Sequence, residues 1–65
     1  MKFRELVKKI EALGFIFERN GKEHDLYRLG DTIVVIPRHK EVNELTARSI
    51  IKKAEKAAIR QKQNK

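Results

Sequence analysis

Apolar side chains near the amino terminus recur with the spacing of one helical face. With 3.6 residues per turn they fall on one side of a helix, and charged side chains fill the other sides. The apolar positions are Phe3, Leu6, Val7, Ile10 and Leu13. Gly14 follows at once and is typical of a residue that ends a helix in a left-handed conformation. The pattern predicts an amphipathic helix up to this glycine.

Three short runs rich in β-branched and aromatic residues come next and predict three strands, at residues 15–18, 24–29 and 32–36. The pair Asn20-Gly21 predicts the first hairpin turn, although Lys22-Glu23 leave the length of that loop open. Gly30-Asp31 predicts a second tight turn. Pro37 lacks an amide donor, so it ends the third strand or lies on its edge. The middle of the chain should therefore form an antiparallel meander.

A second amphipathic helix is predicted after a basic linker. Asn43 is a suitable N-cap, and the buried stripe that follows is Ala47, Ile50, Ile51, Ala54 and Ala58. We expect one domain over residues 1–59 and a frayed basic tail over 60–65. The order α-β-β-β-α predicts an α+β fold in which both helices cover one face of a three-stranded antiparallel sheet. This is the order of the double-stranded-RNA-binding fold.

The amino-acid composition excludes some kinds of functional site and indicates the kind of partner. The chain has 65 residues and no cysteine, which excludes disulfides and thiolate sites and suits a reducing cytoplasm. No signal peptide or membrane-spanning run is visible, so we expect a soluble cytoplasmic protein. Residues 1–36 carry seven Lys and Arg against six Asp and Glu, whereas residues 37–65 carry nine against three. The basic second half predicts a polyanionic partner, either a nucleic acid or an acidic protein.

His24 is the candidate for chemistry. An imidazole can take and give a proton near neutrality, and RNA carries an internal nucleophile, the 2′-hydroxyl, beside each phosphodiester. The other interpretation is a solvated or structural histidine. By strand alternation His24 shares a face with Leu26, and if Leu26 belongs to the core, His24 lies at the rim of the helix side. Glu23 or Asp25 is placed to orient the ring.

Five basic side chains are predicted to position RNA phosphates, from their charge alone: Lys22, Arg28, Arg38, His39 and Lys40. His24 and His39 lack the carboxylate cluster that a metal site needs, so we expect no metal and no cofactor. The spacing of the phenylalanines fits core packing better than base stacking, which leaves Tyr27 as the open aromatic candidate for stacking.

Two stretches and a helix are similar to the HicA family of toxin-type mRNA interferases: 21–27 (Gly-Lys-Glu-His-Asp-Leu-Tyr), 36–43 (Ile-Pro-Arg-His-Lys-Glu-Val-Asn) and 46–52 (Thr-Ala-Arg-Ser-Ile-Ile-Lys). The resemblance extends to about Ala58. Many members carry Gly-Ser where this chain has Lys22-Glu23. The resemblance implies a double-stranded-RNA-binding-like fold, metal-independent cleavage of messenger RNA with His24 as the catalytic residue, and a HicB-like antitoxin that covers the active site.

Three function classes follow. The first is a ribonuclease toxin in which His24 acts as general base or acid. The second is a non-catalytic RNA-binding module that uses the basic second half as a platform and is indifferent to His24. The third is a protein-interaction subunit whose basic face binds an acidic partner.

Overall fold

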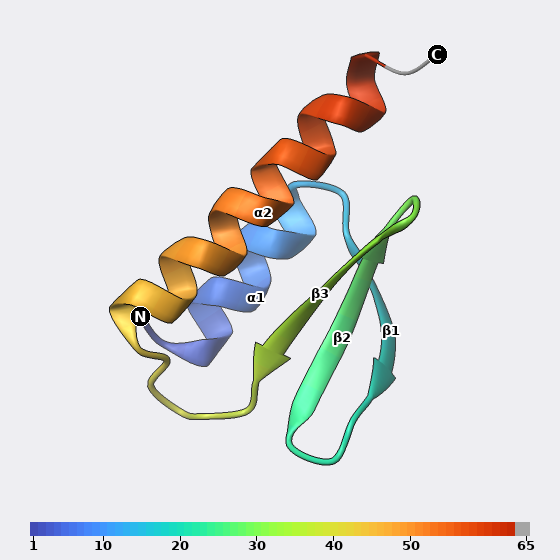
Figure 1. Ribbon diagram of the computed structural model, residues 1–65. Helices are drawn as coiled ribbons and strands as arrows, with labels where there is room; N and C mark the ends of the chain where they lie inside the picture. Colours follow the sequence, from blue (N-terminus) through green and yellow to red (C-terminus); the bar gives the residue numbers. More distant parts are fainter. Residues whose placement is uncertain (64–65) are drawn as a thin grey trace.

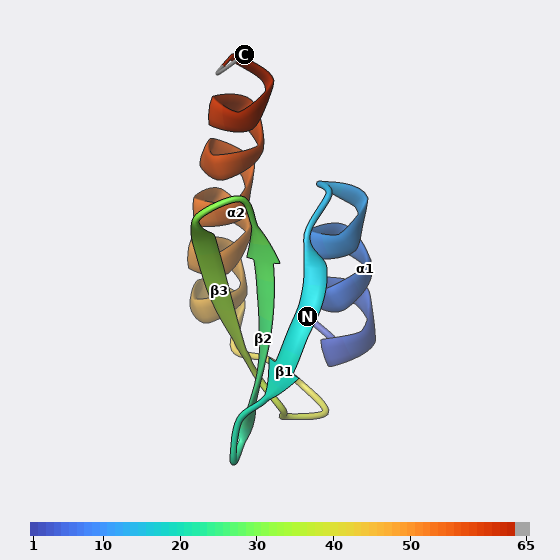
Figure 2. The same ribbon diagram turned by 90° about the vertical axis from the view of Figure 1, so that its right-hand side faces the viewer.

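Two helices cover one face of a sheet made of three consecutive strands. The computed structural model describes residues 1–63. Its elements are α1 (Phe3–Ala12), β1 (Ile16–Asn20), β2 (His24–Leu29), β3 (Thr32–Pro37) and α2 (Glu44–Gln63). The strands lie in the order β1-β2-β3, each antiparallel to the next. Figures 1 and 2 show both helices on the same side of the sheet. The predicted α+β fold with the order α-β-β-β-α is confirmed.

The predicted helix ends are present. Gly14 follows α1 with a φ of 104°, a left-handed value that other residues adopt at a cost. At the start of α2, the side-chain oxygen of Asn43 accepts a hydrogen bond from the amide of Leu45 at 2.9 Å, so Asn43 is the predicted N-cap. Neither helix of the described part of the chain is long and apolar enough to cross a membrane.

The tail predicted to fray is helical up to Gln63. Residues 64 and 65 lie outside the described residues. The side chain of Gln61 lies against Gly30 in the turn between β2 and β3, so closely that a Cβ added to Gly30 would overlap it. Gly30 also has a φ of 61°. Glycine at this position therefore meets the demand of a left-handed turn, whereas the flexible end of the Gln61 side chain can move aside.

The first hairpin differs from its prediction. Asn20 is the last residue of β1 and pairs with Asp25, so it is not a turn residue. The loop is Gly21 to Glu23, closed by a hydrogen bond of 2.6 Å from the Gly21 amide to the His24 carbonyl. Neither Asn20 nor Gly21 has the positive φ of a type I′ turn. Lys22 and Glu23 lengthen the loop, and the Asn20 side chain takes a partner in the next strand instead.

The core lies between the sheet and the helices. Its buried side chains come from both layers: Leu6, Ile10, Phe15, Tyr27, Val34, Ile36, Val42, Ala47, Ala54 and Ala57. The small alanines of α2 let that helix approach closely. In β3, Val34 and Ile36 face the helices, whereas Val35 is 46% exposed on the opposite face. Alternation along the strands thus separates a covered face from an open one.

Replacement of Ile36 by alanine should lower the free energy of unfolding by about 2–5 kcal/mol, because it leaves a cavity in a packed core. The matched variant Val35→Ala removes a side chain of the open face and should cost less than about 1 kcal/mol. Urea denaturation followed by circular dichroism measures both. Equal losses would show that both faces of β3 are packed.

Candidate active site

His24 is the first residue of β2 and lies opposite Pro37, the last residue of β3. Its neighbour Asp25 is 8% exposed and faces the helices, so His24 faces the open side of the sheet and is exposed. Leu26 shares the open face with its partner Val35. The core face of β2 carries Asp25 and Tyr27, and Leu26 is not on it. The condition under which His24 would lie at the rim of the helix side is therefore not met.

Neither predicted carboxylate orients the His24 ring. Asp25 points to the opposite face and accepts a hydrogen bond from the Asn20 side-chain amide at 2.9 Å. The Glu23 side chain is exposed, and its backbone carbonyl accepts a hydrogen bond from the Arg38 amide at 3.0 Å. Among residues 1–63, no side-chain hydrogen bond or ion pair involves the His24 imidazole. The ring is thus free to turn toward a ligand.

Arg38 is tied to the same end of the sheet. Its Nε lies 3.4 Å from Oδ1 of the buried Asp25, and its side chain remains 47% exposed. A guanidinium has five N–H donors, so this contact leaves donors free for a phosphate. Asp25 is therefore an anchor for Arg38. This role of Asp25 can be predicted from the sequence only if Tyr27 is known to face the core. The alternation of side chains along β2 then places Asp25 on the same face as Tyr27.

A shallow hollow of about 340 Å³ lies at this end of the molecule, and its lining residues are Lys22, Glu23, Arg38 and His39. Three of the five predicted phosphate contacts thus gather in the hollow; His24 follows Glu23 in the chain but is not itself a lining residue. Glu23 is the only acidic lining residue. Lys40 lies farther along the same loop and lines a second, larger groove with Arg38 and His39.

Arg28 is not brought to this site. It lies four residues along β2 from His24, about 13 Å away. Glu18 binds its guanidinium through two hydrogen bonds, of 3.0 Å to Nε and 3.2 Å to the terminal nitrogen. This pair raises the pKa of Arg28 and lowers the pKa of the Glu18 carboxyl. Because its charge is already matched, Arg28 is a weaker candidate for a phosphate contact than its sequence suggested.

Tyr27 is not a stacking platform for bases. Its side chain is 6% exposed and lies on the helix side, with its ring packed edge-on against Phe17 at 5.6 Å between centroids. Burial raises the pKa of its phenol. Among residues 1–63, no group of three or more His, Asp or Glu side chains is arranged to hold a metal ion.

Comparison with protein families gives one match that spans most of the chain. A family model described as the HicA toxin of bacterial toxin-antitoxin systems matches residues 3–56. The matched range includes α1, the whole sheet, the basic loop and α2 as far as Lys56. Comparison with curated proteins and with solved structures gives no match.

The pairing of Glu18 with Arg28 makes a prediction about pH. The Glu18 carboxyl should titrate below its ordinary pKa, first because Arg28 donates hydrogen bonds to it. A lowered folded-state pKa stabilises the fold above the unfolded value, and this contribution is lost as the pH falls through the folded value. Side-chain carbon NMR measures the pKa. Arg28→Ala should raise it, whereas Arg19→Ala should raise it much less; an unchanged pKa in Arg28→Ala would contradict the pairing.

Proposed function

Since the chain belongs to the HicA toxin family of bacterial toxin-antitoxin systems, we propose that it is an endoribonuclease that cleaves messenger RNA with His24 as its catalytic residue. The observation that supports this most is the position of His24. Its exposed ring lies at the end of the sheet where Lys22, Arg38 and His39 line a hollow. Cleavage of a phosphodiester requires a proton-transfer group and cations that reach the same phosphate, and both kinds of group occur at this end of the sheet.

The reaction proceeds through the RNA's own 2′-hydroxyl. The His24 imidazole, as general base, takes the hydroxyl proton while the 2′-oxygen attacks the adjacent phosphorus. The bond from phosphorus to the 5′-oxygen breaks, and this oxygen takes up a proton from the imidazolium or from water. The products are a 2′,3′-cyclic phosphate and a 5′-hydroxyl. Arg38 and Lys22 stabilise the negative charge that builds up on the phosphate oxygens. The sequence of steps needs no metal ion.

The family implies an antitoxin partner. We propose that this partner is a HicB-like protein and that it covers His24 and the hollow. The position of His24 supports this, because an exposed ring on the open face is blocked by any protein that binds there. An acidic segment would suit the basic loop of residues 38–40. The proposed cleavage of messenger RNA implies that the protein acts in the cytoplasm.

A non-catalytic RNA-binding module is the second candidate, and one feature of α2 favours it. Four cations follow one another at intervals of four residues and form a stripe along the helix, about 6 Å apart: Arg48, Lys52, Lys56 and Arg60. All four are exposed, and none takes part in an ion pair among the described residues. This stripe and the open face of the sheet belong to different layers, so RNA bound to α2 would not need His24.

The variant His24→Gln separates the two candidates. Under the proposed function it should cleave RNA at least about 100-fold more slowly, because proton transfer is lost, while it keeps the fold and the affinity for RNA. The assay is cleavage of single-stranded RNA by the purified protein in EDTA, with circular dichroism as the check on folding. Asp31→Asn, in the turn that joins the far end of β2 to β3, is the control and should cleave at the wild-type rate. A fully active His24→Gln variant would exclude the proposed role.

A substrate change tests the same step without changing the protein. An RNA whose 2′-hydroxyl at the cleaved position is replaced by hydrogen should bind with nearly the affinity of the unmodified RNA but remain uncut. The unmodified RNA should yield a cyclic phosphate end, which mass spectrometry identifies. Cleavage of the 2′-deoxy substrate at that position would show that water or another nucleophile attacks the phosphorus.

A further inference from the structure

A groove of about 830 Å³ lies between the first turn of α1 and the loop that joins β3 to α2. This volume is within the range of ligand sites, roughly 300–1,000 Å³. One wall comes from α1 and the residue before it, and the other from the loop; the lining residues are Lys2, Phe3, Arg4, Glu5, Arg38, His39, Lys40 and Glu41. The two walls are more than thirty positions apart in the sequence.

Main-chain hydrogen bonds hold the two walls together. The amide of Phe3 donates to the carbonyl of Lys40 at 3.1 Å, and the amide of Val42 donates to the carbonyl of Met1 at 2.7 Å. Lys2 and Glu41 form an antiparallel bridge between these bonds. Because the backbone joins the walls, the groove is formed before any ligand arrives. A preformed site loses less conformational entropy on binding than a site that must fold around its ligand.

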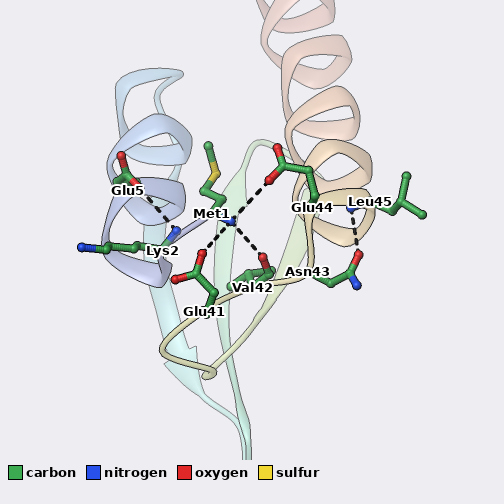
Figure 3. A network of polar contacts seen from close by, with 8 residues as sticks. All are labelled: Met1, Lys2, Glu5, Glu41, Val42, Asn43, Glu44 and Leu45. Atoms are coloured by element: carbon green, nitrogen blue, oxygen red, sulfur yellow. Dashed lines mark hydrogen bonds and ion pairs between the residues drawn. The ribbon is translucent and has the colours of Figure 1, made fainter.

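The groove contains positively charged side chains that form no ion pair among the described residues. Figure 3 shows the partners of its two carboxylates: Glu41 lies 3.1 Å from the amino group of Met1, whereas Glu5 accepts a hydrogen bond of 3.4 Å from the uncharged Lys2 amide and keeps its negative charge. Lys2, Arg4 and Lys40 take part in no ion pair among residues 1–63. A ligand that enters the groove therefore meets free cations on both walls.

The groove also adjoins the candidate active site. Arg38 and His39 line both the groove and the hollow beside His24, so the two depressions lie next to each other. Phe3 packs partly against the core, and the rest of its ring lines the groove. Cations that follow a backbone together with an aromatic ring are the elements with which proteins bind single-stranded RNA.

We propose that this groove binds the stretch of single-stranded RNA next to the cleaved phosphate, with Lys2 and Arg4 on its phosphates and Phe3 against a base. The proposal rests on the proposed function for the position of the cleaved bond. RNA fits this groove better than an acidic segment of a protein does, because the groove combines the aromatic surface with continuity to the catalytic hollow. Charge alone would suit either ligand.

Two double variants with the same loss of charge test the groove. Lys2→Gln/Arg4→Gln removes both cations of the α1 wall, and Lys8→Gln/Lys9→Gln removes two exposed cations of the same helix outside the groove. Each is measured by fluorescence anisotropy in the His24→Gln background, with an oligoribonucleotide of about ten nucleotides, a length that one small domain can bind. The slope of log affinity against log salt should fall by about 1.4 for the groove variant, since each single-strand phosphate contact contributes about 0.7.

The affinity of the groove variant should fall at least 10-fold for the oligonucleotide and stay unchanged for a dinucleotide that occupies only the hollow. The ring protons of Phe3 should shift upfield in NMR spectra when the wild-type oligonucleotide binds, which is a readout that needs no substitution. Equal slopes for the two double variants, or unshifted ring protons, would overturn the proposal. So would a groove variant that binds RNA normally but loses the acidic antitoxin.

Failure of the groove and failure of the catalytic proposal give different results. In the first case the protein with an intact His24 does not cleave RNA in EDTA, but the groove variant still shows a lower affinity and a smaller salt dependence. This result would support RNA binding in the groove and exclude the catalytic role of His24. In the second case the protein cleaves RNA, and the two double variants cleave and bind it equally well. This result would support the ribonuclease activity and exclude RNA binding in the groove. Circular dichroism of both double variants confirms that they are folded.

Discussion

Burial of Asp25 and Tyr27 between the sheet and the helices fixes the direction in which His24 points. Side chains along β2 alternate between the two faces, and Tyr27 is 6% exposed in the core. Since Tyr27 and His24 are three positions apart, the histidine must lie on the open face. A shift of the strand register by one residue would turn the histidine toward the helices and the tyrosine toward water. The position of the ring is therefore maintained by the core itself.

The same burial positions Arg38 at the end of the sheet where His24 lies, although Asp25 and the His24 ring are on opposite faces. The Asp25 carboxylate, held by Asn20 of β1, lies 3.4 Å from Nε of Arg38 and so ties the basic loop to the hairpin that carries His24. The Arg38 amide adds a second tie, to the Glu23 carbonyl. At the other end of β2, Glu18 neutralises Arg28. Arg38 is therefore more available to a ligand than Arg28. The carboxylate of Asp25 is shared between Arg38 and Asn20, whereas the carboxylate of Glu18 binds Arg28 alone.

Sequence periodicity predicted the elements and their order, because helices and strands bury side chains at different, recognisable intervals. The face of β2 that carries His24 was not predictable, since Asp25, Leu26 and Tyr27 give conflicting signals about which side is apolar. Glu18, which pairs with Arg28, lies where the strand register is irregular, between Phe17 and Arg19. No local sequence pattern predicts this irregularity. The groove was missed because its walls are brought together only by the tertiary fold.

The main-chain bonds between Met1, Phe3 and the segment Lys40–Val42 have a consequence for the timing of synthesis. Because synthesis proceeds from the amino-terminal side, residues 1–3 leave the ribosome before residues 40–42, and they have no such partners until the later segment has emerged. Until then neither main-chain bond between the two segments can form, and the loop that holds Arg38 lacks its contacts with residues 1–3. Folding of a small domain as one unit then completes all of these contacts together. A truncated or stalled chain that ends before this point is therefore without an assembled site.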